Sequence, residues 1–411
     1  MNKIVKSLLY LVLLTPLVYA PQFVFPFIFP KMLWLNLTIL PAFILLLINS
    51  IIKEEEIHIP LIIKILFLAQ VISSLFGSDI INSLTNNYER SMGLMTTYLP
   101  VYLLVILLIN TFKTKAEWLN YFKASLVVVS VVALIGLIQY HGWLGDNFLF
   151  NKSHGRIWST LGNFTFVGTM SLWMIFISGW LYSQTKALKY VLPFALGLEM
   201  LFLSGSRSPF IGLIIGLITF IIFFSIKEKG VFRNRIIALA LVLAVIVGYA
   251  FTHPSSIITK EIPGFSHLLD IKLSGTLKTR MFSWEAAWKG FKENPILGNG
   301  LNNFNITFNK YYQKKIEAIG GPYEMWHDNP HSLYFQLLSE QGLLGLVSWL
   351  MLFGSMLVLL FRRSELWLVG FVVAFSVCMS AIFFDISNLV FFFILVAFLC
   401  SIPSLKESSS S

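Results

Sequence analysis

Residues 331–361 read HSLYFQLLSEQGLLGLVSWLMLFGSMLVLLF, and no charged side chain follows Glu340 in this stretch. An apolar run of about 18 residues or more is long enough to cross a bilayer as a helix. Such runs recur along the whole chain of 411 residues, which is 56% hydrophobic and 12% charged, whereas soluble domains carry about 25% charged residues. The chain is therefore predicted to be an all-α polytopic membrane protein.

Hydropathy predicts about twelve transmembrane helices in a single membrane domain, residues 1–411. The N-terminus resembles a signal peptide, but Pro21 directly after Ala20 should hinder cleavage, so the segment is interpreted as a retained first span. The spans are expected at 5–20, 30–52, 59–77, 93–111, 119–141, 165–184, 187–204, 209–226, 234–251, 331–361, 365–384 and 386–402.

The distribution of Lys and Arg in the loops predicts the orientation of the chain. With the N-terminus inside, sixteen Lys and Arg lie in cytoplasmic segments, whereas the short outer segments hold five, namely Lys31, Arg90, Lys152, Arg156 and Arg207. Cytoplasmic loops carry this excess in membrane proteins, so both termini are predicted to be cytoplasmic. One outer segment, residues 252–330, is long and is expected to be a large, partly helical loop between the ninth and tenth spans, a kind of loop that usually carries function.

Several classes of function find no support in the sequence. The net charge of +10 is typical of a protein in contact with anionic lipid, and no nucleic-acid, Walker or dinucleotide motif occurs. Cys378 and Cys400 lie in apolar spans, which favours neither a disulfide framework nor a thiolate metal site. His327 and His331 are four residues apart with Pro330 between them, so no metal site is predicted.

Arg207 lies in the turn Gly205-Ser206-Arg207-Ser208-Pro209, between two predicted spans. Ser208 fits an N-cap and Pro209 fits the first helical position, so Arg207 is expected just before a helix N-terminus. Free N–H groups, the positive end of the helix dipole and a guanidinium together would bind an anion. The alternative is an arginine that only reaches the membrane interface.

His331 has a similar setting in Asn329-Pro330-His331-Ser332. With Asn329 as the N-cap and Pro330 first, His331 is expected in the first helical turn. A helix N-terminus disfavours the imidazolium, so the ring would be able to accept a proton. The alternative is a structural histidine at the interface.

Arg280 is expected to open an amphipathic helix that ends at Asn294-Pro295. Trp284 follows one turn later on the same face, so the guanidinium can stack on the indole and still reach an anion. An ordinary interfacial helix is the competing interpretation. Arg156 and Arg90, in two other outer loops, are further candidates for contact with a ligand, with structural roles as the alternative.

The ordered set of motifs resembles the O-antigen ligase and O-antigen polymerase superfamily. The motifs are the Gly205-Ser206-Arg207 turn, Thr279-Arg280 with Trp284, Lys292-Glu293-Asn294-Pro295-Ile296-Leu297-Gly298-Asn299-Gly300, His331-Ser332-Leu333-Tyr334, and Glu340-Gln341-Gly342-Leu343-Leu344-Gly345. The resemblance runs clearly from about 154 to 360. Ser332 departs from the family, which usually has Asn after the histidine.

This resemblance implies a GT-C-like membrane fold and a metal-independent, inverting glycosyltransferase of the bacterial inner membrane that needs no cofactor. The implied donor is an undecaprenyl-diphosphate-linked glycan on the periplasmic face, bound by Arg207 and Arg280, with His331 as the catalytic base. A lipid A–core acceptor makes the protein an O-antigen ligase, which we favour. A second lipid-linked glycan as acceptor makes it a polymerase, and a protein hydroxyl is a third possibility.

Two alternatives come from other classes. A lipid or solute transporter would suit the number of spans, but the sequence shows neither pseudo-symmetric halves nor a charge in the middle of a predicted span. A scaffold without catalysis would not depend on His331.

Overall fold

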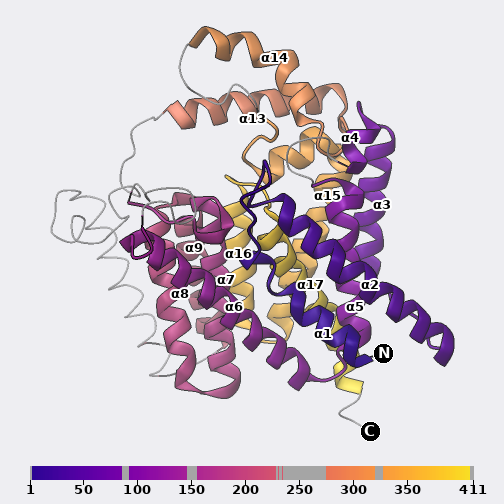
Figure 1. Ribbon diagram of the computed structural model, residues 1–411, viewed down its shortest axis with the longest axis vertical. Helices are drawn as coiled ribbons and strands as arrows, with labels where there is room; N and C mark the ends of the chain where they lie inside the picture. Colours follow the sequence, from indigo (N-terminus) through magenta and orange to yellow (C-terminus); the bar gives the residue numbers. More distant parts are fainter. Residues whose placement is uncertain are drawn as a thin grey trace. The chain divides into compact units, whose positions relative to one another are not determined.

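The computed structural model describes residues 2–85, 92–145, 155–227, 230, 234, 275–319 and 327–407. Within these ranges the chain is helical and contains no strand (Figure 1). Six of the described helices are long and apolar enough to cross a membrane: Phe29–Lys53, Leu94–Thr111, Lys115–His141, Phe164–Thr185, Arg207–Lys227 and Leu333–Arg362. The prediction of an all-helical polytopic membrane protein is confirmed, whereas the number of twelve spans stays a prediction. The predicted span 234–251 lies outside the described residues apart from Asn234.

Contacts divide the chain into two compact units, and whether they act as one membrane domain stays a prediction. Unit 1 consists of Met1–Tyr121, Leu273–Ser355 and Met379–Ser411. Its elements are α1 (Asn2–Val12), η1 (Thr15–Leu17), α2 (Phe29–Lys53), α3 (Leu61–Leu75), α4 (Ile80–Thr85), η2 (Leu94–Tyr98), α5 (Leu99–Thr111), α13 (Gly275–Glu293), α14 (Phe304–Ile319), most of α15 (Leu333–Arg362) and α17 (Ile386–Glu407).

Unit 2 consists of Phe122–Lys272 and Met356–Cys378. Its elements are most of α6 (Lys115–His141), η3 (Ser159–Leu161), α7 (Phe164–Thr185), η4 (Leu188–Tyr190), α8 (Val191–Ser204), α9 (Arg207–Lys227), the end of α15 and α16 (Leu366–Met379). In α8 the regular helix has only 14 residues, shorter than the span expected at 187–204.

The first helix is also shorter than the predicted span 5–20, because α1 ends at Val12. Pro16 has no N–H to donate to the Val12 carbonyl, as the next helical residue would. The hydroxyl of Thr15 donates to that carbonyl instead, at 2.6 Å. The chain therefore leaves the helix through the short turn η1.

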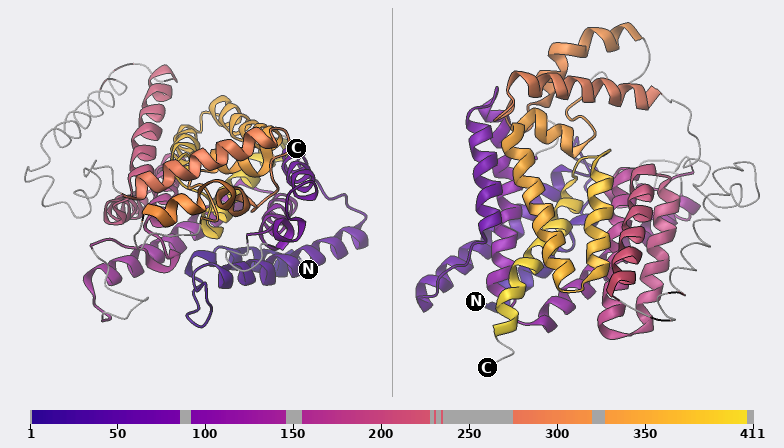
Figure 2. Two further views of the ribbon diagram at one scale, coloured as in Figure 1. Left: turned by 90° about the horizontal axis from the view of Figure 1, so that it is seen from above. Right: turned by 180° about the vertical axis from the view of Figure 1, so that it is seen from behind.

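Unit 2 is built around α7, which is buried along most of its length between α6, α8, α9 and α16 (Figure 2). Gly212 and Gly216 lie one turn apart on α9 and face α16. A Cβ on Gly216 would lie 2.5 Å from the carbonyl oxygen of Gly370, and one on Gly212 would lie 2.5 Å from that of Ala374. Small residues at this spacing let two helix backbones approach closely, as is common in membranes.

Two helices of unit 1, α13 and α14, lie within the segment 252–330 (Figure 1). They pack through a buried cluster of Ala286, Ala287, Phe304, Phe308 and Tyr312. Gly290 lies on the same face of α13, where a Cβ would come within 2.6 Å of the Thr307 methyl group. Small residues on α13 and aromatic residues on α14 therefore make this a close helical pair.

Candidate functional site

In unit 2, Arg207 lies exposed at the turn between α8 and α9. Gly205 ends α8 in the left-handed conformation, with φ 57°, and donates its N–H to Phe202 O at 2.9 Å. The helix α9 begins at Arg207 itself, one residue before the predicted N-cap Ser208, so that Pro209 is the third helical residue. Pro209 is tolerated at this position because the first N–H groups of a helix have no acceptor within the helix, so a proline there loses no hydrogen bond. Arg207 thus lies at a helix N-terminus, as expected.

Arg156 holds this turn in place. Its Nε donates to Ser204 O at 2.8 Å, and its Nη2 donates to Gly205 O at 3.2 Å and to Ser206 Oγ at 3.3 Å. The guanidinium also lies 4.1 Å from the centre of the Phe164 ring. Arg156 therefore satisfies the carbonyl end of α8, a structural contact that the sequence did not specify.

The charge of Arg156 also bears on Arg207. Burial lowers the pKa of Arg156, and the positive charge of Arg207 lowers it further. Two cations thus lie near each other at this end of unit 2. The Nη1 group of Arg156 donates no hydrogen bond within the described residues, which leaves it available to an anion.

Gln139 of α6 also contributes to this site, although the sequence analysis does not predict it. Its Oε1 accepts the backbone N–H groups of Trp158 at 3.2 Å and Ser159 at 3.0 Å. Ser159 in turn donates its hydroxyl to Val132 O on α6, at 2.7 Å. A polar side chain inside an otherwise apolar span is the signal that could have identified it.

In unit 1, α13 ends at Glu293, directly before Asn294-Pro295, as predicted, but it begins at Gly275, one turn or more before Arg280. The indole of Trp284 stacks on Phe335 of α15 with ring centres 5.6 Å apart and planes 12° apart. Its buried N–H has no acceptor within the described residues. Trp288 is 46% exposed and contacts Phe291, so the aromatic face of α13 is only partly covered.

A chain of contacts runs from α13 to His331. The Ser283 hydroxyl lies 3.2 Å from Nδ1 of His327, and the His327 ring lies 6.1 Å from that of His331. The His331 ring also packs against Phe383, at 5.6 Å. Because Arg280 precedes Ser283 and Trp284 by three and four residues, it lies on the same face of α13. Ser283 of α13 is therefore linked through His327 to His331, and Arg280 lies one turn before Ser283 on the same helix.

The local backbone of His331 differs from the prediction. His331 has a φ of 51° and donates its N–H to Oδ1 of Asn329 at 3.0 Å, and α15 begins only at Leu333. The predicted place in the first helical turn was therefore wrong. The Asn329 side chain closes a local turn, which competes with helix formation, and Ser332 O accepts the first helical bond from Gln336 at 2.9 Å.

Backbone hydrogen bonds join residues 295–300 to residues 339–344 of α15, and this pair of segments is here called the clamp. The N–H groups of Asn299 and Gly300 donate to Ser339 O at 2.9 Å and Glu340 O at 2.8 Å, and that of Leu343 donates to Pro295 O at 2.8 Å. Gly342 interrupts α15 with φ 61° and ψ −154°. These are the two glycine-rich motifs of the sequence, and their close approach explains the glycines.

Glu340 of this clamp lies in the first third of α15 and is fully buried. Its Oε2 accepts a hydrogen bond from Gln336 Nε2 at 3.2 Å. Arg90 lies outside the described residues, so its candidate role stays a prediction. Among the residues that are described, no group of three His, Cys, Asp or Glu could hold a metal ion.

Comparison with known families adds to this geometry. Residues 192–350 match the O-antigen ligase family. The matched segment contains Arg207, Arg280, Trp284 and His331 together with both motifs of the clamp, whereas Arg156 precedes it. No curated protein matches the chain. The resemblance to the O-antigen ligase and polymerase superfamily is confirmed, which supports an integral membrane protein of the glycosyltransferase type.

Proposed function

We propose that this protein transfers a glycan from an undecaprenyl-diphosphate donor to a hydroxyl group of lipid A–core, as an O-antigen ligase. The observation that carries the proposal is the family match over residues 192–350, which includes Arg207, Arg280 and His331. The reaction is metal-independent and inverts the anomeric carbon. The protein resides in the bacterial inner membrane with both termini cytoplasmic, and the reaction takes place on the periplasmic face.

Arg207 and Arg280 bind the diphosphate and stabilise the negative charge that grows as it leaves. The exposed position of Arg207 at the start of α9 supports this role, because a helix N-terminus and a guanidinium both favour an anion. Arg156 contributes a third positive charge and the Nη1 donors. Arg90 stays a candidate for the same ligand. No nucleotide is required, because the donor is already activated.

His331 accepts the proton of the acceptor hydroxyl while the oxygen attacks the anomeric carbon and the bond to the diphosphate breaks. The contacts of His331 with His327 and Phe383 support this role, since they hold the ring in a defined position. Trp284 is a further candidate for contact with the donor, and its indole N–H, which has no acceptor within the described residues, supports this role. Asn329 fixes the backbone of the base.

An O-antigen polymerase is the alternative within this class. It uses the same donor and the same residues, and differs in taking a second lipid-linked glycan as acceptor. A lipid or solute transporter is the alternative from another class. The buried Glu340 favours it, because ionisable groups within membrane helices often mark transport pathways. The hydrogen bond between Glu340 and Gln336 is also what a carboxyl group with a purely structural role would make.

The test uses purified protein in nanodiscs with an undecaprenyl-diphosphate glycan, without nucleotide or metal. One reaction contains lipid A–core and the other contains the donor alone. A ligase couples glycan to lipid A–core, and a polymerase lengthens the glycan on the donor alone. We expect the first result and its loss in His331→Ala.

His58→Ala is the matched control, because His58 is exposed and lies far from His331 in the sequence. Full activity of His331→Ala would refute the role of the base. Arg207→Ala that binds donor but does not transfer glycan would argue against a transporter. Absence of transfer in both reactions by the unaltered protein would overturn the ligase and polymerase assignments for these substrates.

A further inference from the structure

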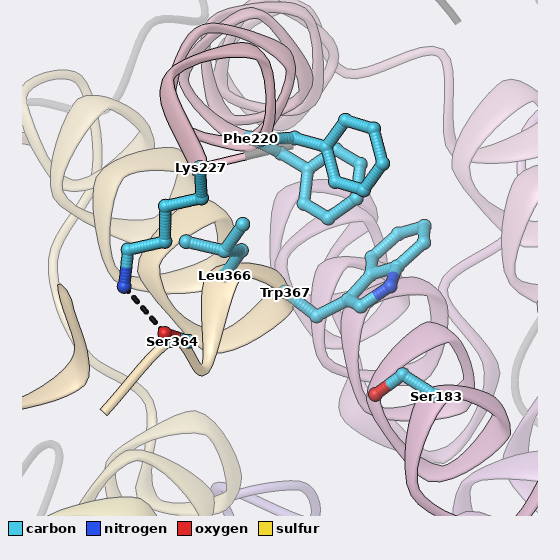
Figure 3. Close-up of a pocket in the computed structure, with 7 residues that line it drawn as sticks. Ser183, Phe220, Lys227, Ser364, Leu366 and Trp367 are labelled. Atoms are coloured by element: carbon cyan, nitrogen blue, oxygen red, sulfur yellow. Dashed lines mark hydrogen bonds between the residues drawn. The ribbon is translucent and has the colours of Figure 1, made fainter. Parts of the chain in front are cut away.

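A cavity of about 480 Å³ lies in unit 2 between α7, α9 and the start of α16 (Figure 3). It is lined by Ser183, Phe220, Phe224, Lys227, Ser364, Leu366 and Trp367. None of these residues belongs to the candidate site described above. Lys227 is the last of the 21 residues of α9, so about 30 Å of helix separates it from Arg207.

One end of the cavity is cationic. The Lys227 ammonium donates to Ser364 Oγ and to Phe361 O, both at 2.6 Å. Within the described chain no carboxylate pairs with it. The nearby carboxylate of Glu365 is bound by Trp180 at 2.7 Å and Gln184 at 3.1 Å. Among the described residues, the positive charge of Lys227 is therefore not paired with an acid.

Further cations lie close in sequence to residues of this lining. Lys186 follows α7 and Lys189 lies in η4, where both are exposed, and Lys189 lies 5.5 Å from the centre of the Tyr190 ring. Arg362 is the last residue of α15, and Arg363 follows it directly before Ser364. Such clusters of Lys and Arg at helix ends attract anionic lipid headgroups.

The other end is aromatic. The Phe220 ring and the Trp367 indole lie 4.5 Å apart between their centres, and Figure 3 shows both across the cavity from Lys227. A second cavity of about 170 Å³, lined mainly by apolar groups, also includes Trp367. On α9 the order from Lys227 is Phe224 and then Phe220, so the apolar surface extends along the helix away from the charge.

This order matches the chemistry of a phospholipid. The length of α9 between Arg207 and Lys227 is close to the hydrocarbon thickness of a bilayer, about 30 Å. Lys227 is then at the depth of the headgroups, and the aromatic residues are at the depth of the acyl chains. The excess of cations and the absence of an acid in the described lining favour an anionic headgroup over a zwitterionic one.

We propose that this cavity binds one anionic glycerophospholipid, with the phosphate on Lys227 and Ser364 and an acyl chain along Phe224, Phe220 and Trp367. The site is separate from the proposed donor site at Arg207, and it does not depend on the proposed glycosyl transfer. Bound lipid would tie α9 to the start of α16 and stabilise unit 2.

The test measures the thermal unfolding of the full chain in detergent, with phosphatidylglycerol or phosphatidylcholine added. We expect phosphatidylglycerol to raise the midpoint by several degrees and phosphatidylcholine to raise it by much less. Lys227→Gln should lose most of the rise. Lys53→Gln is the matched control, because it removes the same charge from the exposed end of α2, and it should keep the full rise.

A second variant separates lipid binding from the hydrogen bonds of Lys227 to its neighbours. Ser183→Phe keeps Lys227 and fills the cavity, so it should also reduce the rise. An unchanged rise in both variants would overturn the proposal. An equal rise with phosphatidylcholine or with water-soluble glycerol 3-phosphate would overturn it too, and a larger rise with polyprenyl phosphate would assign the cavity to a different lipid.

Discussion

Replacing Gly298 by alanine tests the clamp between residues 295–300 and α15. Gly298 has a φ of 68° and donates its N–H to Asn294 O at 2.9 Å. A Cβ at this position would overlap the carbonyl carbon of Glu340 and the backbone nitrogen of Gln341, and would lie 2.5 Å from the Glu340 oxygen. These are backbone atoms, and the hydrogen bonds of Asn299 and Gly300 to the same turn of α15 prevent them from moving away.

The cost can be estimated from two contributions. A left-handed conformation costs an alanine about 1–2 kcal/mol, and overpacking costs about 1–3 kcal/mol. Together they predict a loss of about 2–5 kcal/mol in the free energy of unfolding, against a total of about 5–15 kcal/mol for a typical protein. Gly298→Ala should therefore lower the stability of the protein markedly.

The assay is unfolding of the purified protein in mixed micelles, with Gly354→Ala as the matched control. Gly354 lies in α15, and a Cβ there would meet no atom within 4 Å, so alanine should be neutral or stabilise the helix by up to about 1 kcal/mol. An unfolding free energy of Gly298→Ala within about 0.5 kcal/mol of the unaltered protein would show that the clamp is not rigid.

Three further predictions concern other parts of the chain. Arg156→Gln should lower both thermal stability and glycan transfer, because the half-buried guanidinium anchors the end of α8. Arg207→Gln should lower transfer while the melting temperature stays nearly constant; equal melting temperatures of the two variants would contradict the anchoring role. Lys310, helped by a tyrosine, lowers the pKa of Glu293 below its ordinary value of 4.5. The stabilisation from this ion pair is present at neutral pH and lost as the pH falls below that value, so Lys310→Met should weaken the acid dependence of unfolding; an unchanged acid profile would argue against the pair. Asn303→Ala should cost about 1–3 kcal/mol, because this fully buried amide has four hydrogen-bond partners; thermal unfolding of the variant measures the loss.

The ends of several helices could be predicted because their signals are local. Asn294-Pro295 ends α13 as expected, since the residue before a proline avoids helical backbone angles. Pro16 shortens α1 for a related reason, whereas hydropathy alone extends the predicted span to residue 20.

The turn at His331 could not be predicted in the same way. Asn329 and Pro330 are equally compatible with a helix start and with a local turn. The structure selects the turn, and the N–H of Leu333 donates to Ile382 O at 2.9 Å. That contact joins residues far apart in the sequence, so no local sequence pattern predicts it.

Composition and hydropathy by themselves determined that this is a helical membrane protein, because a chain in lipid must satisfy its backbone hydrogen bonds within each apolar segment. The order of short motifs was enough to indicate the family. Only the tertiary structure decided that Arg156 anchors the turn of Arg207, that Ser283 and His327 link α13 to His331, and that two glycine motifs close on each other. Contacts of this kind depend on backbone positions set by packing between distant segments, which spacing along one segment does not specify.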